Sequence, residues 1–446
     1  MSTTTCDQPW LPLTLAQLDF WEEFMLHPHR PLSTVAHCLT LQGAVDELAL
    51  LRAIAQTARE ADILSVRFHL AEPQLLPAQQ CDPQRAPLPL WFDLRAESDP
   101  LAAAKRLMQA DIDAQLTLIG NSLVEQWLIC VDDCQYLWYL RGHHIILDGY
   151  AMVLIEQRCA QLYTYFLGKG AAGQPFHRFV DFIVEEQAYQ QSQRYRDDQR
   201  YWRDYLAQVE ALPVLRKDAG NYGDEGVHLE CPLPATFGPL LAQLASRVSV
   251  GWPDLLVLLS GAYLYYHTPF LRHGNELSLW LPFMSRWGSV SAYLPALIVN
   301  ILPLHITCAP QESLADYLLR SAQVLRRQRA HGRYRVEQIA SDMGIGKGQR
   351  YFFSPLVNVL PFDEPMFDGC SVAREVLASG PGDGFNITYR GSSSAAELVL
   401  HLDVDAAMAD LPTLVRHQQQ LLDFLARALQ PQALMQPLHQ LLQAEG

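Results

Sequence analysis

The sequence lacks several features that would assign it to a well-defined class. Its nine cysteines include no C-x-x-C pair, and no secretory signal is visible before Pro12. Its longest apolar runs, such as residues 255–266, are shorter than the ~20 residues that a membrane span needs. We therefore expect neither a disulfide framework nor a membrane protein. The odd number of cysteines favours a reducing cytoplasm.

Several catalytic and ligand-binding motifs are also missing. No G-x-S-x-G supplies an esterase-type serine, and no H-E-x-x-H supplies a zinc site. The glycine-rich run SGPGDG at 379–384 lacks the lysine and the spacing of a phosphate-binding loop, so we interpret it as a mobile loop. We therefore expect no nucleotide site in this run.

Positive charge is scarce. The chain has 48 acidic against 33 basic residues and a formal net charge of −15, which argues against a nucleic-acid partner and slightly favours a cationic ligand. At 446 residues and 49% hydrophobic composition, the chain is long enough for two globular domains with substantial cores.

Helix-like and strand-like patterns alternate in both halves, which is typical of a mixed α/β protein. Apolar residues at helical spacing predict helices at 47–58, 101–116, 150–167, 254–267, 312–330 and 411–429. Branched and aromatic residues predict a hairpin at 123–141 and strands at 277–283, 298–306, 351–360, 386–390 and 398–404. The run GKGAAGQ at 168–174 is the most linker-like stretch, so we place the boundary between residues 1–175 and 176–446.

The segment RGHHIILDG, residues 141–149, combines the adjacent His143 and His144 with Asp148 and Gly149. It lies between a predicted strand and a predicted helix, where active-site loops are common. One imidazole can face a cavity while its neighbour turns inward, and a carboxylate can orient a ring or pair with a cation. The residues alone leave two alternatives open. These are a buried histidine pair bonded to the backbone, and a metal site, for which no suitably spaced third ligand is present.

HHIILDG resembles the HHxxxDG signature of the condensation domains of non-ribosomal peptide synthetases. Other segments are similar to further core elements of that family, and these lie at 13–21, 60–68, 282–288, 299–304 and 351–358. The resemblance extends from about Leu13 to the last predicted helix. Within the family, the RWGSV, GRYR-x-EQI and VLASG segments look most like the free-standing amide synthase of the vibriobactin type.

The resemblance implies two chloramphenicol-acetyltransferase-like lobes in a V-shaped pseudo-dimer, with the active-site tunnel between them. It also implies that an acyl thioester arrives on the phosphopantetheine arm of an aryl or peptidyl carrier protein and is attacked by a small soluble amine. By analogy, the acyl group is 2,3-dihydroxybenzoyl and the amine is a polyamine in siderophore biosynthesis. The chain itself is expected to be a cytoplasmic monomer that binds no cofactor, metal, nucleic acid or membrane.

The same resemblance implies roles for individual residues. His144 would contact the attacking nitrogen, either as a general base or by positioning the amine, while His143 packs inward. Asp148 would form a structural salt bridge with Arg286. Gly149 would line the tunnel, where even a methyl group would block the thioester. Further tunnel contacts are expected from Asn300, Asn386 and Trp287.

Two other functions stay open at this point. An N-acyltransferase that takes its acyl group directly from acyl-CoA would use the same histidine motif. A condensation-like module that only recruits partners would be expected to lose motif residues, and all four are present. Epimerisation domains usually continue with Ser-Trp, whereas Tyr150 and Ala151 follow here, and heterocyclisation domains replace the histidines with aspartates.

Overall fold

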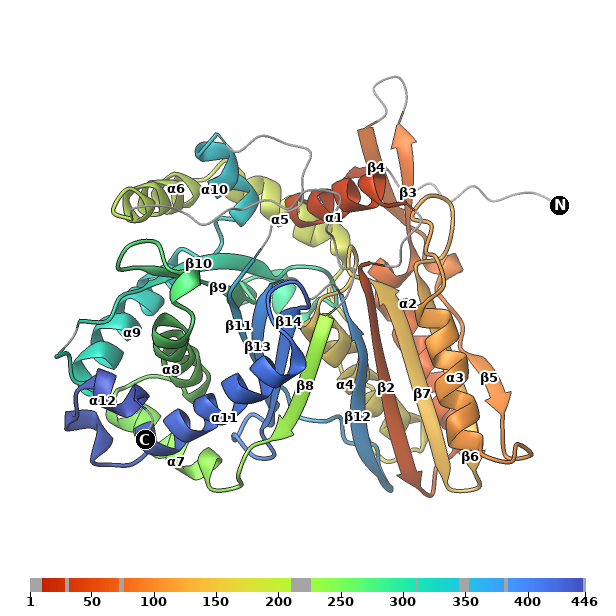
Figure 1. The fold of residues 1–446 in the computed structure, drawn as a ribbon. Coiled ribbons are helices and arrows are strands. Elements are labelled where there is room, and N and C mark those ends of the chain that lie inside the picture. The colour runs from red at the N-terminus through yellow and green to blue at the C-terminus, as the bar shows by residue number, and fades with distance from the viewer. Residues whose placement is uncertain are drawn as a thin grey trace. The chain divides into compact units, whose positions relative to one another are not determined.

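The computed structural model describes residues 10–28, 32–71, 76–209, 226–309, 311–344, 353–380 and 384–443. The chain forms two compact mixed α/β units, each assembled from several stretches of sequence (Figure 1). Unit 1 contains the chain up to Gln191 together with 286–299 and 364–381, and unit 2 contains 192–285, 300–363 and the chain from Gly382. This division differs from the single cut expected after residue 175, because two later segments pack in unit 1.

Unit 1 is built on a five-stranded sheet in the order β12-β2-β7-β6-β5. Its strands are β2 (Thr34–Gly43), β5 (Leu90–Asp93), β6 (Val124–Asp132), β7 (Gln135–His143) and β12 (Cys370–Ser379). All neighbours are antiparallel except β5 and β6. A separate small sheet has the order β1-β4-β3, formed by β1 (Leu11–Pro12), β3 (Val66–Ala71) and β4 (Leu76–Cys81).

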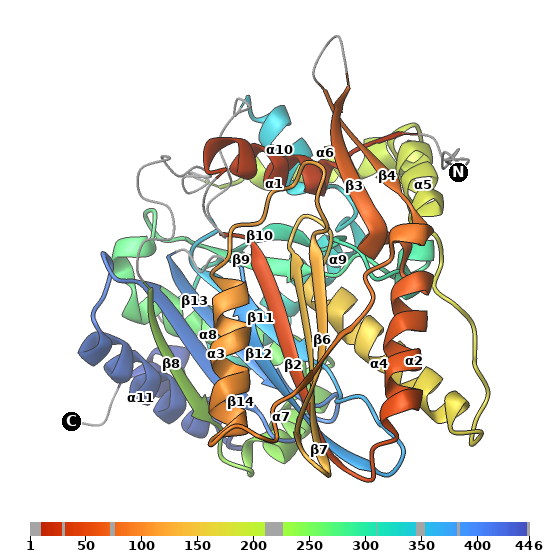
Figure 2. The same cartoon turned by 90° about the vertical axis from the view of Figure 1, so that its right-hand side faces the viewer.

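Both faces of the five-stranded sheet are covered by helices. The helices of unit 1 are α1 (Leu15–Leu26), α2 (Glu47–Glu60), α3 (Pro100–Ile112), α4 (Gly149–Phe166) and α5 (Phe179–Gln190). Along β7, Trp138 and Leu140 pack in the cluster that contains α2 and α4, whereas Leu137 and Tyr139 pack with α3 on the opposite face (Figure 2). Because side chains alternate between the two faces of a strand, a strand covered on both sides has a nearly continuous apolar sequence.

Unit 2 is built on a six-stranded sheet in the order β10-β9-β11-β13-β14-β8. Its strands are β8 (Gly226–Pro232), β9 (Leu277–Phe283), β10 (Asn300–Ile306), β11 (Leu356–Pro361), β13 (Phe385–Gly391) and β14 (Val399–Asp405). Its helices are α6 (Gln193–Leu206), α7 (Phe237–Arg247), α8 (Trp252–His267), α9 (Leu314–Ala330), α10 (Val336–Asp342), α11 (Leu411–Ala428) and α12 (Leu438–Leu442). Strand β11 is parallel to both of its neighbours.

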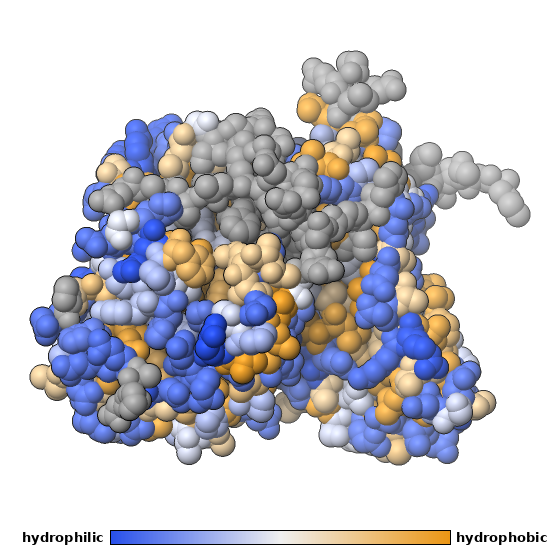
Figure 3. Space-filling view, in the orientation of Figure 1, coloured by the Kyte–Doolittle hydropathy of each residue, from blue (hydrophilic) through white to orange (hydrophobic). Residues whose placement is uncertain are grey.

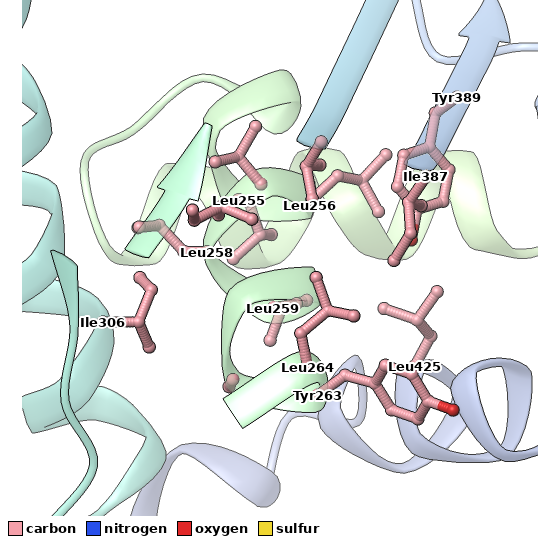
Figure 4. Packing of buried hydrophobic residues seen from close by; sticks show 14 of the residues in the cluster. Leu255, Leu256, Leu258, Leu259, Tyr263, Leu264, Ile306, Ile387, Tyr389 and Leu425 are labelled. Carbon is pink, nitrogen blue, oxygen red and sulfur yellow. The ribbon is translucent and has the colours of Figure 1, made fainter. Parts of the chain in front are cut away.

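Helix α8 lies in the core of unit 2 and is apolar on nearly every side. Leu255, Leu258, Leu259 and Leu264 are fully buried among side chains of the sheet and of α11 (Figure 4). A helix that is apolar on every side is stable when protein surrounds it on every side. The apolar run at 255–266 is therefore a core helix, and it is too short for a membrane span. Among the described residues, no single helix is long and apolar enough to cross a membrane, and α7 with α8 meets the criterion only as a pair bent by 93°.

Most of the predicted elements are confirmed, with shifts at their ends. The helix expected at 101–116 stops at Ile112, and the strand expected at 351–360 corresponds to β11, which begins at Leu356, while residues 351–352 lie outside the described ranges. Among the strands of unit 1, the sequence patterns predict only the β6–β7 hairpin, and not β2, β5, β12 or the small sheet. On the face shown in Figure 3, hydrophilic residues cover much of the described surface, with apolar residues scattered between them.

Candidate active site

The HHxxxDG segment forms the connection between β7 and α4 in unit 1. His143 is the last residue of β7 and pairs with Thr34 of β2, and Asp148 is the N-cap of α4, where its Oδ1 accepts a hydrogen bond of 2.8 Å from the Ala151 N–H. The three intervening apolar residues, 145–147, are fully buried. The connection is therefore fixed at both ends and in its middle, which limits how far the two imidazoles can move.

His143 lies inside this turn. Its side chain is 7% exposed, and its Nδ1 accepts a hydrogen bond of 3.0 Å from the Ile145 N–H. A neutral imidazole whose Nδ1 accepts carries its proton on Nε2. The ring thus stabilises the turn that presents the next residue.

His144 is half-buried and is contacted from several directions. Its backbone N–H donates to the Ser33 carbonyl at 2.7 Å, and its ring stacks on Phe20 of α1 with 4.9 Å between centroids and 17° between planes. Its Nδ1 is buried, so a ligand would have to meet the ring at Nε2. A neutral imidazole can accept a proton or a hydrogen bond from an amine there.

Gly380 lies at the edge of the His144 ring. A Cβ built on Gly380 would be only 3.0 Å from His144 Cδ2, and the backbone has a φ of +79°. Both observations favour glycine, which has no Cβ and tolerates positive φ. The sequence predicts residues 379–384 to be a mobile loop. Instead, Ser379 ends β12 and the Gly380 N–H donates to the Thr34 carbonyl at 3.0 Å, while 381–383 lie outside the described residues.

Asp148 and Arg286 form the ion pair that the resemblance implies. Arg286 Nη2 lies 2.8 Å from both carboxylate oxygens of Asp148, and both side chains are buried. Asp148 Oδ2 also accepts hydrogen bonds from the Ile298 and Val299 N–H groups at 2.9 and 3.0 Å. Burial alone would raise the pKa of Asp148, but the Arg286 guanidinium and the backbone donors outweigh it and hold the pKa below its ordinary value. The aspartate is therefore ionised at neutral pH.

Arg286 also connects the motif to residues 286–299. Its Nη1 donates to the carbonyls of Ser291 and Leu294 at 2.8 and 2.7 Å, and its Nη2 donates to the Ala296 carbonyl at 2.9 Å. The Tyr150 ring lies 5.1 Å from the guanidinium carbon. This arginine thus binds a whole loop to the start of α4, which explains why residues 286–299 belong to unit 1.

Gly149 and Trp287 are the exposed members of the predicted set. Gly149 is the first residue of α4, and among the described residues an added Cβ would meet no atom within 4 Å outside its chain neighbours and its own helix backbone. Trp287 follows the buried Arg286 directly and is 93% exposed. Both have surfaces available to a ligand.

The side chain of Asn300, in contrast, is buried and fully hydrogen-bonded. It is 1% exposed, its Nδ2 donates to the carbonyls of Gly332 and Tyr334 at 3.0 Å each, and its Oδ1 accepts from the Val336 N–H at 3.1 Å. These bonds stabilise the start of α10, so we replace its predicted role in the tunnel with a structural one. Asn386 is buried on β13 opposite Asp403, and both asparagines belong to unit 2, whereas His144 belongs to unit 1.

Sequence reasoning missed Phe20 and underestimated Gly380 as neighbours of His144. The first lies within the 13–21 segment that resembles the family's opening element, and the second within the glycine-rich run. Neither sequence segment indicates that its residue contacts His144, which is more than a hundred positions away along the chain. Within the described ranges, no group of three or more histidine, cysteine, aspartate or glutamate side chains is arranged to hold a metal ion.

Comparison with known proteins gives a consistent result. The Condensation domain family model matches residues 7–431. The crystal structure of VibH, a non-ribosomal peptide synthetase condensation enzyme, has a TM-score of 0.86 and 36% sequence identity, covering 96% of this chain and all of VibH. The starter condensation domain of rhizomide synthetase RzmA, solved with C8-CoA and Leu-SNAC, has a TM-score of 0.83 and 25% identity, covering 96% of each chain.

Curated relatives are longer proteins. Enterobactin synthase component F of Escherichia coli is 30% identical over 431 residues, which is 95% of this chain and 33% of that protein. Across the first three curated relatives, the matched chain spans between 17% and 33% of their length.

Proposed function

The chain belongs to the condensation-domain family, and on this premise we propose that it is a stand-alone enzyme that joins a carrier-bound acyl group to a small soluble amine. Condensation domains are amide-forming acyltransferases whose substrates are carried on phosphopantetheine. The similarity covers all of VibH, a non-ribosomal peptide synthetase condensation enzyme, which supports a condensation activity for this chain.

In the proposed reaction, the amine nitrogen attacks the thioester carbonyl carbon, a C–N bond forms and the C–S bond breaks. The proton that leaves the amine ends on the departing phosphopantetheine thiolate, so the products are an amide and a free thiol. His144 acts as a base or by positioning the nucleophile. No acyl-enzyme intermediate is required.

The observation that carries the proposal is the placement of the His144 imidazole. It lies in the connection between β7 and α4, stacked on Phe20 and bordered by Gly380, with its Nδ1 buried. The buried pair of Asp148 and Arg286 stabilises the same turn. This arrangement fits a ring that presents one nitrogen in a fixed direction to a reacting group.

The substrate class is proposed from the relatives. Enterobactin synthase component F and vanchrobactin synthetase VabF of Vibrio anguillarum are named for siderophores, which supports a siderophore pathway. We propose 2,3-dihydroxybenzoyl as the acyl group and a polyamine as the acceptor. The net charge of −15 suits a cationic acceptor.

The proposal includes the rest of the family's organisation. It comprises two acetyltransferase-like lobes in a V with a tunnel between them, an aryl or peptidyl carrier protein as partner, and a cytoplasmic monomer. Within this organisation, Gly149 and Trp287 contact substrate.

The direct test uses the purified chain, a carrier domain loaded with 2,3-dihydroxybenzoate and a panel of diamines and polyamines, with products identified by mass spectrometry. We expect amide formation with at least one amine. His144→Ala should lower the rate about 100-fold or more while leaving the circular dichroism spectrum unchanged. His177→Ala, an exposed histidine of the same unit, is the matched control and should retain activity.

Absence of an amide with every carrier-loaded acyl group and amine would reject the proposed reaction. A His144→Ala variant as fast as His177→Ala would reject the role of His144. If the wild type and the His177→Ala variant both fold normally and neither forms product, a module that only recruits partners would be favoured.

A second candidate is an N-acyltransferase that takes acyl-CoA directly. It is favoured by the rhizomide starter condensation domain, which was solved with C8-CoA. Comparing kcat/KM for 2,3-dihydroxybenzoyl-CoA and for the carrier-bound thioester separates the two candidates. We expect the carrier-bound substrate to be preferred, and equal values would favour the CoA-dependent enzyme.

A further inference from the structure

We propose that Phe20 is a positioning residue for the reaction, which sets the orientation of the His144 imidazole through a face-to-face stack. This inference rests on the proposed function, since it concerns the same imidazole. It adds to the proposed active site a residue outside the HHxxxDG motif, and it gives α1 the role of holding that residue against His144.

The beginning of α1 is fixed before Phe20 is reached. Thr14 and Gln17 form a reciprocal capping box, in which the Gln17 N–H donates to Thr14 Oγ1 at 3.3 Å and the Thr14 N–H donates to Gln17 Oε1 at 2.9 Å. The Gln17 amide also pairs with the amide of Gln79 on β4, at 2.8 and 2.7 Å. All three side chains are buried. The helix therefore has a defined position and rotation about its axis.

A second attachment lies on the same face of α1 as Phe20. Glu23 is three residues further along, so its side chain projects beside that of Phe20. Glu23 is buried and accepts a hydrogen bond from the Ser33 hydroxyl. The Ser33 carbonyl in turn accepts the His144 N–H at 2.7 Å. One face of α1 is thus linked to His144 directly, through the Phe20 ring, and indirectly, through the bond from Ser33 to Glu23.

Gly380 borders the ring at another position. Its Cα lies beside the Cδ2 edge of the imidazole, where a Cβ would come within 3.0 Å. With Phe20 against one face, Gly380 against this edge and the Nδ1 side buried, rotation about the Cβ–Cγ bond meets atoms in several directions. Of these three restraints on the ring, the stack on Phe20 is the one that a side-chain substitution can remove without changing the backbone.

Orientation matters because the acceleration from positioning depends on small displacements. A near-attack arrangement requires the reacting atoms at about 3–3.5 Å, and a misplacement of about 1 Å can cost on the order of 100-fold in rate. A planar ring 17° from parallel restricts the imidazole to one plane, which a branched aliphatic side chain of similar size does not. Loss of the stack should therefore lower kcat more than it affects substrate binding.

The test compares Phe20→Leu and Phe20→Tyr with Phe24→Leu in the full chain. Phe24 is the matched control because it is also half-buried on α1, but its ring contacts Trp21. We expect Phe20→Leu to lower kcat about ten-fold with KM changed less than about two-fold. Phe20→Tyr keeps the ring and should retain the wild-type kcat, and Phe24→Leu should do so as well. Thermal stability should fall similarly in both leucine variants.

A second readout does not depend on turnover. In protein labelled at histidine, the His144 ring protons, assigned with His144→Gln, should lie upfield in the wild type because of the Phe20 ring current. They should move downfield in Phe20→Leu and stay in place in Phe24→Leu.

The outcomes distinguish this inference from the proposed function. If the wild type forms amide but Phe20→Leu matches Phe24→Leu in kcat, the positioning role is rejected whether or not the resonances move. An effect confined to KM also rejects it, since Phe20 would then be a substrate contact. A wild type that forms no amide, with the His144 resonances shifted by Phe20→Leu, rejects the proposed function and leaves the stack itself demonstrated.

Discussion

Substitution of Gly149 by alanine should affect protein stability and substrate access in opposite directions. Outside its chain neighbours and its own helix backbone, an added methyl meets no atom of the described residues within 4 Å, and alanine is a better helix former than glycine by up to about 1 kcal/mol. We therefore expect Gly149→Ala to unfold at the same or a higher temperature, yet to lose about ten-fold or more in kcat/KM with the carrier-bound thioester. Thermal melts and steady-state kinetics check both parts.

Gly251→Ala, at the N-cap of α8 in unit 2, is the control for a glycine at a helix start and should leave kcat/KM unchanged. If Gly149→Ala is fully active, the surface beside the start of α4 does not face the substrate.

Removing Arg286 from the Asp148–Arg286 pair should lower the free energy of unfolding more than removing the charge of Asp148. Removing one partner of a buried ion pair typically costs about 3–5 kcal/mol. Arg286→Met also leaves the carbonyls of Ser291, Leu294 and Ala296 without their donor, whereas Asp148→Asn keeps an acceptor for the Ala151 N–H. We expect both variants to lose stability in urea unfolding, with the larger loss in Arg286→Met.

The double variant should lose less than the sum of the two single losses, because each single change already removes the shared interaction. Since the folded pKa of Asp148 lies below its unfolded value near 4, the carboxylate's contribution is present above about pH 4 and is lost as the pH falls further. A loss in Asp148→Asn that is equally large in strong acid would contradict this assignment.

At the scale of elements, the first N–H group of α5 is bonded to the buried carboxyl group of Asp62, which opposes folding at neutral pH. Both oxygens of Asp62 accept from the Phe179 N–H, at 3.2 and 3.0 Å, and burial raises the pKa of Asp62 to about 6. Because the folded pKa is above the unfolded one, the favourable contribution is complete below about pH 4 and is lost as the pH rises through 6.

Asp62→Asn removes this titration and keeps an acceptor for Phe179. We expect it to stabilise the protein at pH 8 by up to about 3 kcal/mol, with a much smaller effect near pH 4. Urea unfolding at the two pH values measures the difference. Asp204→Asn, at an exposed carboxylate on α6, is the control, and a similar pH dependence in both variants would contradict the burial argument.

At the scale of the whole molecule, unit 1 cannot be cut out as one continuous piece. Strand β12 pairs with β2 from Cys370 opposite Gly43 to Ser379 opposite Val35, and Arg286 also lies outside the first 191 residues. A fragment of residues 1–191 would expose the β2 edge and leave Asp148 buried without its cation. We expect it to show no cooperative urea transition, whereas the full chain shows one. A cooperative transition in the fragment would show that the later segments are dispensable.

Patterns between near neighbours predicted much of the fold and the centre of the candidate site. Helices such as α2, α4 and α11 and the β6–β7 hairpin are encoded in apolar spacing within a few residues, and HHxxxDG is contiguous. The pairing of Asp148 with Arg286 could be expected only through the family resemblance. Predictions based on single residue types, such as a tunnel role for Asn300, were weaker because a buried amide serves equally well to bond backbone groups.

The sequence by itself determined that α2, α4, α11 and the β6–β7 hairpin form and which imidazole follows the buried strand, because both depend on residues adjacent along the chain. Only the tertiary structure decided that β12 joins the sheet of unit 1 and that Phe20 and Gly380 border His144. Those contacts join residues more than a hundred positions apart. Their register depends on how the whole core packs, and no local pattern records it.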